Sequence, residues 1–153
     1  MRVFNFEVEG GHTYFVSENG ILVHNACAWA TRSATLPEKS GVYIIELKGK
    51  VYVGQAGNVR TRLTGKHDQK AIIQHPDAQI AVIEVDVSHL KNAADQERAL
   101  KVIESDVINS MGSLKAQSAD GVEGLNVRIP LTPDQRELYR QKLRPVVVDY
   151  LEY

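Results

Sequence analysis

The chain has 153 residues, of which 43% are hydrophobic, and its formal net charge is −1. A chain of this length can bury one modest core with a small appendage, and its near-neutral charge argues against a surface that binds nucleic acid over its whole extent. The single cysteine, Cys27, excludes an intramolecular disulfide and a four-cysteine zinc site, and the lack of a bilayer-length apolar run or a secretion signal predicts a soluble chain with no membrane partner.

The N-terminal stretch predicts three short strands. Residues 2–8 alternate with a period of two, and residues 13–16 and 21–23 form two more apolar runs. Glycine-containing turns at 10–11 and 18–20 separate the three runs. Because a sheet of this size has too little core for independent stability, we expect the meander to pack against another part of the chain or to be only partly ordered.

This stretch, FNFEVEGGHTYFVSENGILVHN, resembles the C-terminal end of Hint domains, the self-processing modules of inteins and hedgehog-type proteins. The resemblance rests on His12 before an aromatic pair, on Asn19-Gly20 and on the terminal His24-Asn25. It implies that Asn25 cyclises on its own backbone carbonyl and breaks its bond to Ala26, with proton transfer by His24 and with His12 as a second candidate. An ordinary β meander is the alternative.

Two departures from the Hint pattern shape this expectation. The upstream half of such a domain, with its N-terminal nucleophile, is absent from this sequence, and Ala26 stands where a splicing intein has Cys, Ser or Thr. We therefore expect a full-length precursor to be cut after Asn25 without ligation, and the present chain to cleave slowly or not at all.

Residues 26–40 are small and polar, contain Pro37 and lack a clear period, so they predict a linker with one helical turn around Trp29. In bacterial polymorphic toxins, a Hint segment that ends in His-Asn commonly lies directly before the toxic domain. The resemblance therefore makes Ala26 the expected start of an effector.

Residues 41–63, GVYIIELKGKVYVGQAGNVRTRL, predict a strand, a tight turn, a second strand and a helix. An apolar, β-branched run precedes the turn at 48–50, and the second strand ends at a glycine, which suits a hairpin. Asn58 is expected to cap the short helix that follows.

Basic side chains gather around this stretch. Between residues 39 and 70 the sequence has seven lysines and arginines and two acids, a local excess of five positive charges. The paired strands and the next helix can bring Tyr43, Tyr52 and arginines to one surface, which suits an anionic, phosphate-bearing partner. A merely solvated charged face is the alternative. The seven basic residues are Lys39, Lys48, Lys50, Arg60, Arg62, Lys66 and Lys70.

The same stretch closely resembles the signature of GIY-YIG nucleases. Its first element is Gly41-Val42-Tyr43 and its second is Tyr52-Val53-Gly54, with valine in both where the family name has isoleucine. The resemblance implies that Tyr43 and Tyr52 are catalytic, together with Arg62, which lies ten residues beyond Tyr52 as the helical arginine does in family members. A hairpin with two half-buried tyrosines is the alternative.

Neighbouring residues extend the predicted site. Many family members have a lysine or glutamine after the second glycine, which Gln55 matches. Gln55, Arg60 and Lys66 are predicted nucleic-acid contacts, with Arg60 either a phosphate contact or a solvent-facing residue. Relatives often place a histidine four residues after the arginine, whereas His67 follows it by five. A helix that ends at Gly65 would still bring His67 inward as a catalytic residue, and a plain helix-end histidine is the alternative.

Downstream, the sequence predicts a helix, a strand and a long helix. Residues 68–78 are expected to form a short helix that stops before Pro76, and residues 79–87 alternate as a strand beside the hairpin. From Asn92 to about Met111, apolar residues recur with the spacing of a helix that buries one face.

Glu104 lies inside the apolar stripe of this long helix. A buried carboxylate is unfavourable unless it is paired or bound to a cation. The family's metal-binding glutamate lies on the corresponding helix and is followed three and four positions later by apolar residues, which 107–108 match. Glu97 is the competing candidate for the metal ligand. A structural Glu104 paired with Lys101 or Lys115 is the alternative.

The C-terminal part predicts a polar loop and another helix. Residues 113–124 are expected to form the loop, and Asn126 resembles the family's closing asparagine, which braces the site. Thr132 is expected to cap a helix that packs on the sheet and that Pro145 kinks or restarts.

The predicted fold class is α/β (α+β), a small mixed three-stranded sheet flanked by helices as in GIY-YIG domains, after a short N-terminal β meander. The predicted segments are a Hint remnant at 1–25 and a linker at 26–40. A GIY-YIG-like nuclease domain at 41–130 and a C-terminal helical extension at 131–153 follow.

The resemblances imply a metal-dependent endonuclease, the toxic effector of a bacterial polymorphic toxin that is secreted and delivered to the cytoplasm of a target cell. DNA is the expected substrate in preference to RNA, and a cognate immunity protein is a further expected partner. Glu104, waters and the scissile phosphate would hold one Mg²⁺ or Mn²⁺ ion. Tyr43 or Tyr52 would position or deprotonate the attacking water, with a pKa lowered by the basic cluster and the ion, and Arg62 would neutralise charge on the phosphate. A non-catalytic nucleic-acid-binding module and a structural adaptor are the alternatives.

Overall fold

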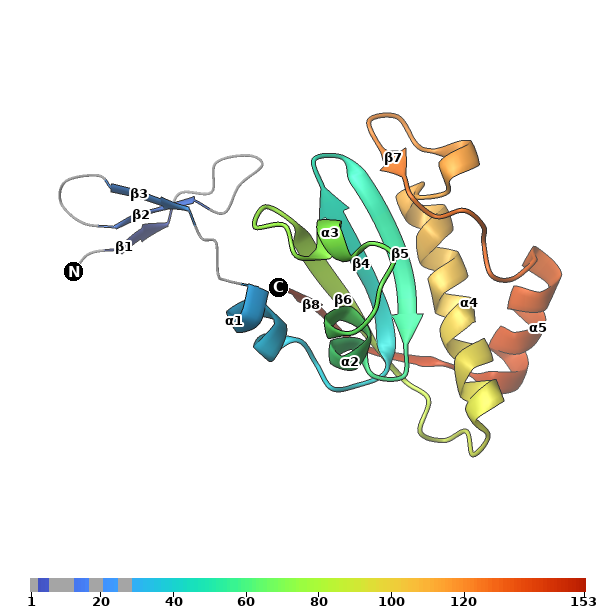
Figure 1. The fold of residues 1–153 in the computed structure, drawn as a ribbon. Helices are drawn as coiled ribbons and strands as arrows, with labels where there is room; N and C mark the ends of the chain where they lie inside the picture. The colour runs from blue at the N-terminus through green and yellow to red at the C-terminus, as the bar shows by residue number, and fades with distance from the viewer. Residues whose placement is uncertain (1–2, 6–12, 17–20, 25–28) are drawn as a thin grey trace.

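The structure is a computed structural model that describes residues 3–5, 13–16, 21–24 and 29–153 (Figure 1). β1 (Val3–Asn5), β2 (Thr13–Val16) and β3 (Ile21–His24) pair in that order as antiparallel neighbours. The predicted three-strand meander is therefore confirmed.

Most residues that carry the Hint resemblance lie outside the described residues. This holds for His12, Asn19-Gly20 and Asn25. His24 is the last residue of β3, opposite Thr13 in the strand register. Self-processing at Asn25 stays a prediction.

A five-stranded mixed sheet follows, in the order β7-β5-β4-β6-β8. Its strands are β4 (Gly41–Leu47), β5 (Lys50–Ala56), β6 (Gln79–Asp86), β7 (Glu123–Gly124) and β8 (Val146–Glu152). Neighbouring strands are antiparallel except β5 and β7, which are parallel. The three predicted strands form the centre of this sheet, and two edge strands that were not predicted complete it.

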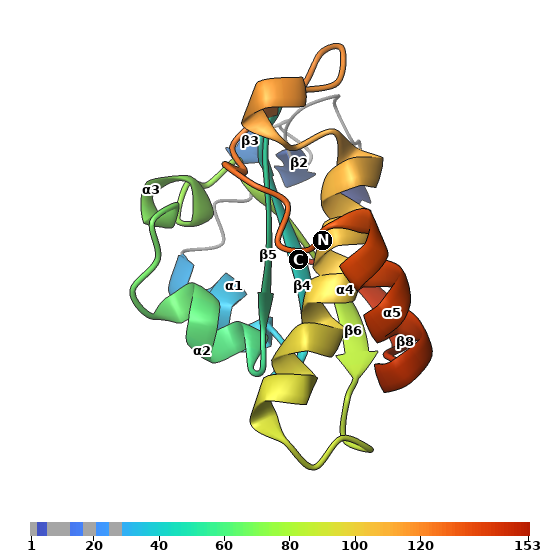
Figure 2. The ribbon, with the colours of Figure 1, turned by 90° about the vertical axis from the view of Figure 1, so that its right-hand side faces the viewer.

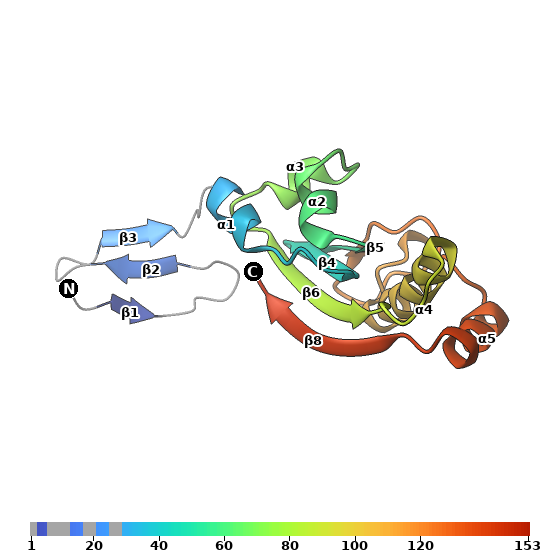
Figure 3. The ribbon, with the colours of Figure 1, turned by 90° about the horizontal axis from the view of Figure 1, so that it is seen from below.

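Helices cover both faces of this sheet (Figures 2 and 3). α1 (Trp29–Thr35), α2 (Val59–Thr64) and α3 (Lys70–Ile73) lie on one face. α4 (Ala93–Met111) covers the other face, with α5 (Pro133–Leu143) packed against it, and a 3₁₀ turn (Lys115–Gln117) lies between them in the chain. None of the described helices is long and apolar enough to cross a membrane.

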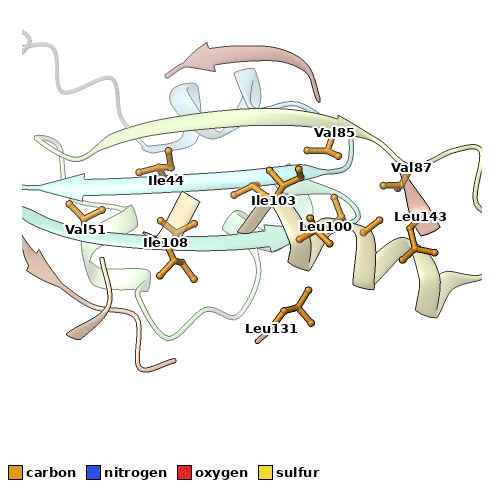
Figure 4. Close-up of a cluster of buried hydrophobic side chains, with 13 residues drawn as sticks. Ile44, Val51, Val85, Val87, Leu100, Ile103, Ile108, Leu131 and Leu143 are labelled. Carbon is orange, nitrogen blue, oxygen red and sulfur yellow. The ribbon is translucent and has the colours of Figure 1, made fainter. Parts of the chain in front are cut away.

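Each face of the sheet has its own apolar core. On the α4 face, Val42 and Ile44 of β4 pack in one cluster with Leu100 of α4 (Figure 4). On the α2 face, Tyr43 packs in a second cluster with Leu63 of α2. Successive side chains of a strand point to opposite faces, so the nearly continuous apolar run of β4 is explained by burial on both sides.

The hairpin of β4 and β5 turns at Lys48 and Gly49, whose φ angles are 51° and 83°. Two successive residues in the left-handed region are what a type I′ turn requires, and glycine adopts this region without a steric penalty. Downstream, Asn58 Oδ1 accepts a hydrogen bond of 3.0 Å from the Thr61 amide and caps α2. The predicted hairpin, turn and cap are confirmed.

The prediction that the C-terminal helix continues or restarts at Pro145 is wrong. The predicted start is correct, because Thr132 and Gln135 form a capping box at α5. α5 ends at Arg144, which has φ 48° and ψ 59°, and the chain then forms β8 as an antiparallel neighbour of β6. Three successive valines favour extended backbone, and the open side of β6 supplies their hydrogen-bond partners.

Residues 29–40, which fall in the predicted linker, pack onto the body. The helical turn predicted around Trp29 is present as α1. Arg32 of α1 donates hydrogen bonds to the carbonyl oxygens of Ile73 (2.8 Å) and Ala78 (2.5 Å), and Leu36 is fully buried. This segment therefore forms part of the same folded unit as the sheet.

Candidate active site

Tyr43 and Tyr52 lie on the same face of the hairpin. In the register of β4 and β5, Tyr43 is opposite Gly54 and Tyr52 is opposite Ile45, which makes the two tyrosines diagonal neighbours. Their ring centroids are 6.4 Å apart. Tyr43 is buried and Tyr52 is partly exposed, so the pair extends from the core to the surface.

Gly54 makes room for the ring of Tyr43. A Cβ atom built on Gly54 would overlap the hydroxyl oxygen and ring of Tyr43. The glycine of the second signature element therefore has a physical role, because any larger residue would displace the Tyr43 side chain from its place across β5.

His67 completes a cluster of three rings. Its Nε2 lies 2.8 Å from Tyr43 Oη, and its ring centroid is 5.8 Å from that of Tyr43 and 5.5 Å from that of Tyr52. α2 ends at Gly65, whose amide bonds to the Thr61 carbonyl oxygen, and the following turn directs His67 inward. The position of His67 agrees with the predicted inward placement after a helix end.

A backbone contact determines which nitrogen of His67 carries the proton. The Gln69 amide donates to His67 Nδ1 at 2.9 Å. The neutral ring therefore has its hydrogen on Nε2, and it donates that hydrogen to Tyr43 Oη. Burial, followed by the positive charge of Arg62, lowers the pKa of His67, which favours the neutral form.

Arg62 faces this cluster from α2. Its guanidinium donates to the Lys66 carbonyl oxygen at 3.2 Å, which fixes the side chain across the end of the helix. Burial and the neighbouring Tyr52 raise the pKa of Tyr43, whereas Arg62 interacts with the Tyr43 phenol and acts to lower that pKa. Arg62 is thus placed to stabilise negative charge on the phenol or on a bound phosphate.

Glu104 approaches from α4, on the opposite face of the sheet. β7 pairs only with Lys50 and Val51 of β5, so no strand in the described part of the chain pairs with the rest of this side of β5. Burial raises the pKa of Tyr52, and the charge of Glu104 raises it further. The same charge also acts on Tyr43, so Glu104 lies within electrostatic range of both phenols.

Glu104 and Glu97 differ in environment. Burial raises the pKa of Glu104 to about 7, although Lys101 and Arg128 act to lower it. Glu97 is exposed and forms an ion pair of 2.7 Å with Lys101, and this contact lowers the pKa of Glu97. Lys101 therefore bonds to Glu97, and Glu104 is the half-buried one of the two carboxylates.

Asn126 braces β5 beside the site. Its Oδ1 accepts from the Val53 amide (2.9 Å) and from Ser113 Oγ (2.8 Å), and its Nδ2 donates to the Val53 carbonyl oxygen (2.7 Å). The geometry is the bracing that the resemblance implied for Asn126. Ser113, which is fully buried, was missed by sequence reasoning because nothing in its loop context marks it.

A groove of about 880 Å³ opens next to Arg62, between the end of β5, α2 and the start of α4. Gln55 and Lys66, two of the predicted nucleic-acid contacts, line it. Arg60 has other partners, the Leu36 carbonyl oxygen (2.7 Å) and Glu38 (3.1 Å), so it ties α2 to the preceding segment. Its role as a nucleic-acid contact stays a prediction.

A divalent cation such as Mg²⁺ needs several oxygen ligands. Within the described part of the chain, no group of three or more His, Cys, Asp or Glu side chains could hold a metal ion. The residues therefore do not fit an all-protein cage. They fit the sparser mode in which Mg²⁺ is held by one carboxylate, here Glu104, with waters and substrate phosphate completing the coordination.

Tyr43, Tyr52 and His67 come together from β4, β5 and the turn after α2, and Asn126 bonds to the backbone of β5. Comparisons with protein-family models, with curated proteins and with solved structures found no match for this chain.

Proposed function

We propose that this protein is a metal-dependent nuclease that hydrolyses phosphodiester bonds of nucleic acid. The observation that supports the proposal most directly is the cluster of two tyrosines and a histidine with an arginine beside it, within electrostatic range of a half-buried carboxylate. These groups are Tyr43, Tyr52, His67, Arg62 and Glu104. Hydrolysis of a phosphodiester needs a positioned water, a proton acceptor and positive charge at the phosphate, and this set can supply each of them.

Tyr43 is the phenol whose oxygen has a side-chain hydrogen-bond donor. His67 donates a hydrogen bond to Tyr43 Oη, and Arg62 adds positive charge nearby. Tyr52 is more exposed and is the phenol that a water at the surface would reach first. We therefore assign Tyr52 to positioning the attacking water and Tyr43 to accepting its proton.

Arg62 and Glu104 act on the phosphate. Arg62 lines the open groove and would neutralise charge that grows on the phosphate oxygens. Glu104, together with waters and the phosphate, would hold a divalent cation. When bound, such a cation supplies charge stabilisation at the phosphate and lowers the pKa of a bound water.

The tyrosines are not bases in the free protein at neutral pH. Burial raises the pKa of both phenols, and the lowering effect of Arg62 does not outweigh it. The basic cluster is also partly neutralised, because Lys39 pairs with Glu84 (2.9 Å) and Arg60 with Glu38 (3.1 Å). We therefore expect hydrolysis to depend on added Mg²⁺ or Mn²⁺.

A non-catalytic nucleic-acid-binding module is the second candidate. The same raised phenol pKa values favour it, since protonated tyrosines can stack and donate without reacting. The further context, an effector of a polymorphic toxin released after Asn25, delivered to a target cell, acting on DNA and inhibited by an immunity protein, rests on the Hint and GIY-YIG resemblances and is part of the proposal.

Cleavage assays distinguish the two candidates. The protein is incubated with supercoiled plasmid and with total RNA, each with Mg²⁺, with Mn²⁺ or with EDTA, and the products are separated on gels. We expect nicked or linear plasmid with either metal and intact plasmid in EDTA. Salt-sensitive binding without cleavage in any of these conditions contradicts the nuclease and supports the binding module.

A matched pair of variants tests the tyrosine assignment. Tyr52→Phe keeps the ring and removes the hydroxyl, so plasmid cleavage should fall strongly. Tyr150→Phe makes the same change at an exposed tyrosine of β8 and should leave cleavage unchanged. Equal cleavage by both variants contradicts a role for the Tyr52 hydroxyl.

A further inference from the structure

β8 is one edge of the five-stranded sheet, and in the described part of the chain no strand pairs with its outer side. All seven of its residues are exposed. Val147, Val148 and Tyr150 are 55%, 57% and 53% exposed. A long apolar edge strand without proline or lysine is a ready template for pairing with another strand.

The ladder between β6 and β8 indicates which groups of β8 point outward. Tyr153 and Ile80 exchange backbone hydrogen bonds of 2.7 and 3.4 Å, so in the antiparallel pattern the amides of Glu152 and Tyr150 point away from β6. The Tyr150 amide donates to Asp149 Oδ1 at 2.8 Å. An incoming strand can therefore bond to the Tyr150 amide only after Asp149 has released it.

A groove of about 590 Å³ adjoins β8 on the face that α4 covers. Ile83 of β6 and Met111 of α4 contribute apolar walls, and Tyr150 and Glu152 form its β8 side. The charged residues that line the groove, Glu46 and Glu152, are both acidic. The groove can take a lysine or arginine side chain, whose methylene stem packs on the apolar walls and whose charge meets the two glutamates.

The charges of β8 restrict what can pair with it. The strand has two carboxylates, Asp149 and Glu152, and no basic residue. A second copy that paired through β8 would bring the same acids close to one another, which is unfavourable. A strand with lysine or arginine on the groove face would bring positive charge to Glu152. The acidic edge thus favours basic strands and disfavours acidic ones.

We propose that β8 and the groove beside it are the docking surface for an extended segment of a partner protein in which apolar and basic residues alternate. The segment adds a strand to β8. Because successive side chains of a strand point to opposite faces, its basic side chains enter the groove beside Glu46 and Glu152. Its apolar side chains then lie along Leu151 on the other face of the sheet. β4 and β6 separate this surface from β5, so docking leaves Tyr52 uncovered.

Synthetic peptides serve as probes for this surface. The first is a fluorescein-labelled nonapeptide that alternates isoleucine and lysine, the second has glutamate in place of lysine, and the third is the lysine peptide with alternate amides N-methylated. Fluorescence anisotropy with the full chain should show binding of the first. The second should bind about tenfold more weakly, since exposed charge pairs change from attraction to repulsion. The third should lose binding, because it cannot complete the ladder.

A matched pair of charge reversals locates the site. Glu152→Lys changes the β8 edge, and Glu123→Lys makes the same change on β7, at the opposite edge of the sheet. Both side chains are exposed, so the unfolding midpoint should stay unchanged in each variant. Glu152→Lys should lose the preference for the lysine peptide over the glutamate peptide, and Glu123→Lys should keep it.

Backbone amide shifts in the NMR spectrum complete the test. The lysine peptide should shift the amides of 146–152 and leave those of α2 in place. Equal binding of the lysine and glutamate peptides overturns the proposal, as do shifts centred on the groove beside Arg62. A dimer in sedimentation that Glu152→Lys changes would assign this edge to a second copy and would also overturn it.

Discussion

The two edges of the central sheet are completed in different ways. At the β5 edge, the Asn126 side chain bonds to both the amide and the carbonyl of Val53, and β7 pairs with the start of the strand. At the β8 edge, all seven residues are exposed, and Asp149 bonds to the outward amide of Tyr150. The fixed edge carries the candidate active site, where small displacements matter, and the open edge is suited to a partner.

The largest effect on stability is expected at the fixed edge, from Asn126→Ala. The change leaves the Val53 backbone groups and the Ser113 hydroxyl buried without partners, which should lower the free energy of unfolding by about 3 kcal/mol. Denaturant unfolding measures this. Val127→Ala, at a neighbour that is 84% exposed, is the control and should stay within about 0.5 kcal/mol of the parent. A similar small change in both variants would mean that the brace is not needed.

Gly54→Ala tests whether the cleavage rate depends on the position of the Tyr43 ring at the fixed edge. The new methyl group would overlap the ring of Tyr43 and displace its hydroxyl from His67, so plasmid cleavage should fall about 100-fold. Gly57→Ala is the matched control, because a Cβ there meets nothing within 4 Å. Cleavage by Gly54→Ala at the parent rate would show that the position of Tyr43 is not critical.

The parts of this site that could be predicted are those with local signals. The hairpin, the cap at Asn58 and the pairing of Tyr43 with Tyr52 follow from a period of two, a glycine turn and a capping residue. The prediction at Pro145 failed because three valines followed by Asp149 are compatible with a helix or with a strand. The segment forms a strand because the unpaired side of β6 supplies hydrogen-bond partners for it. The contacts of Arg32 and Ser113 could not be predicted, because they join residues far apart in the sequence and no local sequence pattern indicates them.

The pH dependence of stability tests the burial of Glu104. Its pKa in the folded protein is about 7, above its ordinary value of 4.5. The folded state therefore holds the proton more tightly, and this stability is fully present below pH 4.5 and is lost as the pH rises through 7. We compare the free energy of unfolding of Glu104→Gln with that of the parent in EDTA. As the pH rises from acidic to mildly alkaline, this difference should shift by about 2 kcal/mol in favour of the variant, after allowance for the partial exposure of Glu104. If this difference in unfolding free energy does not change with pH, the Glu104 carboxylate is exposed to water in the folded protein.

The smallest effect is expected at the open edge, from Val148→Thr. This residue is 57% exposed, and threonine keeps the β-branched shape, so the free energy of unfolding should change by less than about 0.5 kcal/mol. The same substitution at the fully buried Val53, Val53→Thr, should lower it by about 2 kcal/mol, since the hydroxyl enters an apolar core. Equal effects in denaturant unfolding would remove the contrast between the two edges.

We propose that the half-buried carboxylate of Glu104 and the tyrosine pair form one metal-dependent active site. The most direct test is the Mg²⁺-dependent cleavage rate of plasmid by Glu104→Gln beside that by Glu97→Gln. We expect Glu104→Gln to fold and to keep its affinity for nucleic acid. Its rate of hydrolysis should fall by about three orders of magnitude, and each factor of ten corresponds to about 1.4 kcal/mol of activation free energy. Glu97→Gln should cleave like the parent. Cleavage at the parent rate by Glu104→Gln would contradict the account.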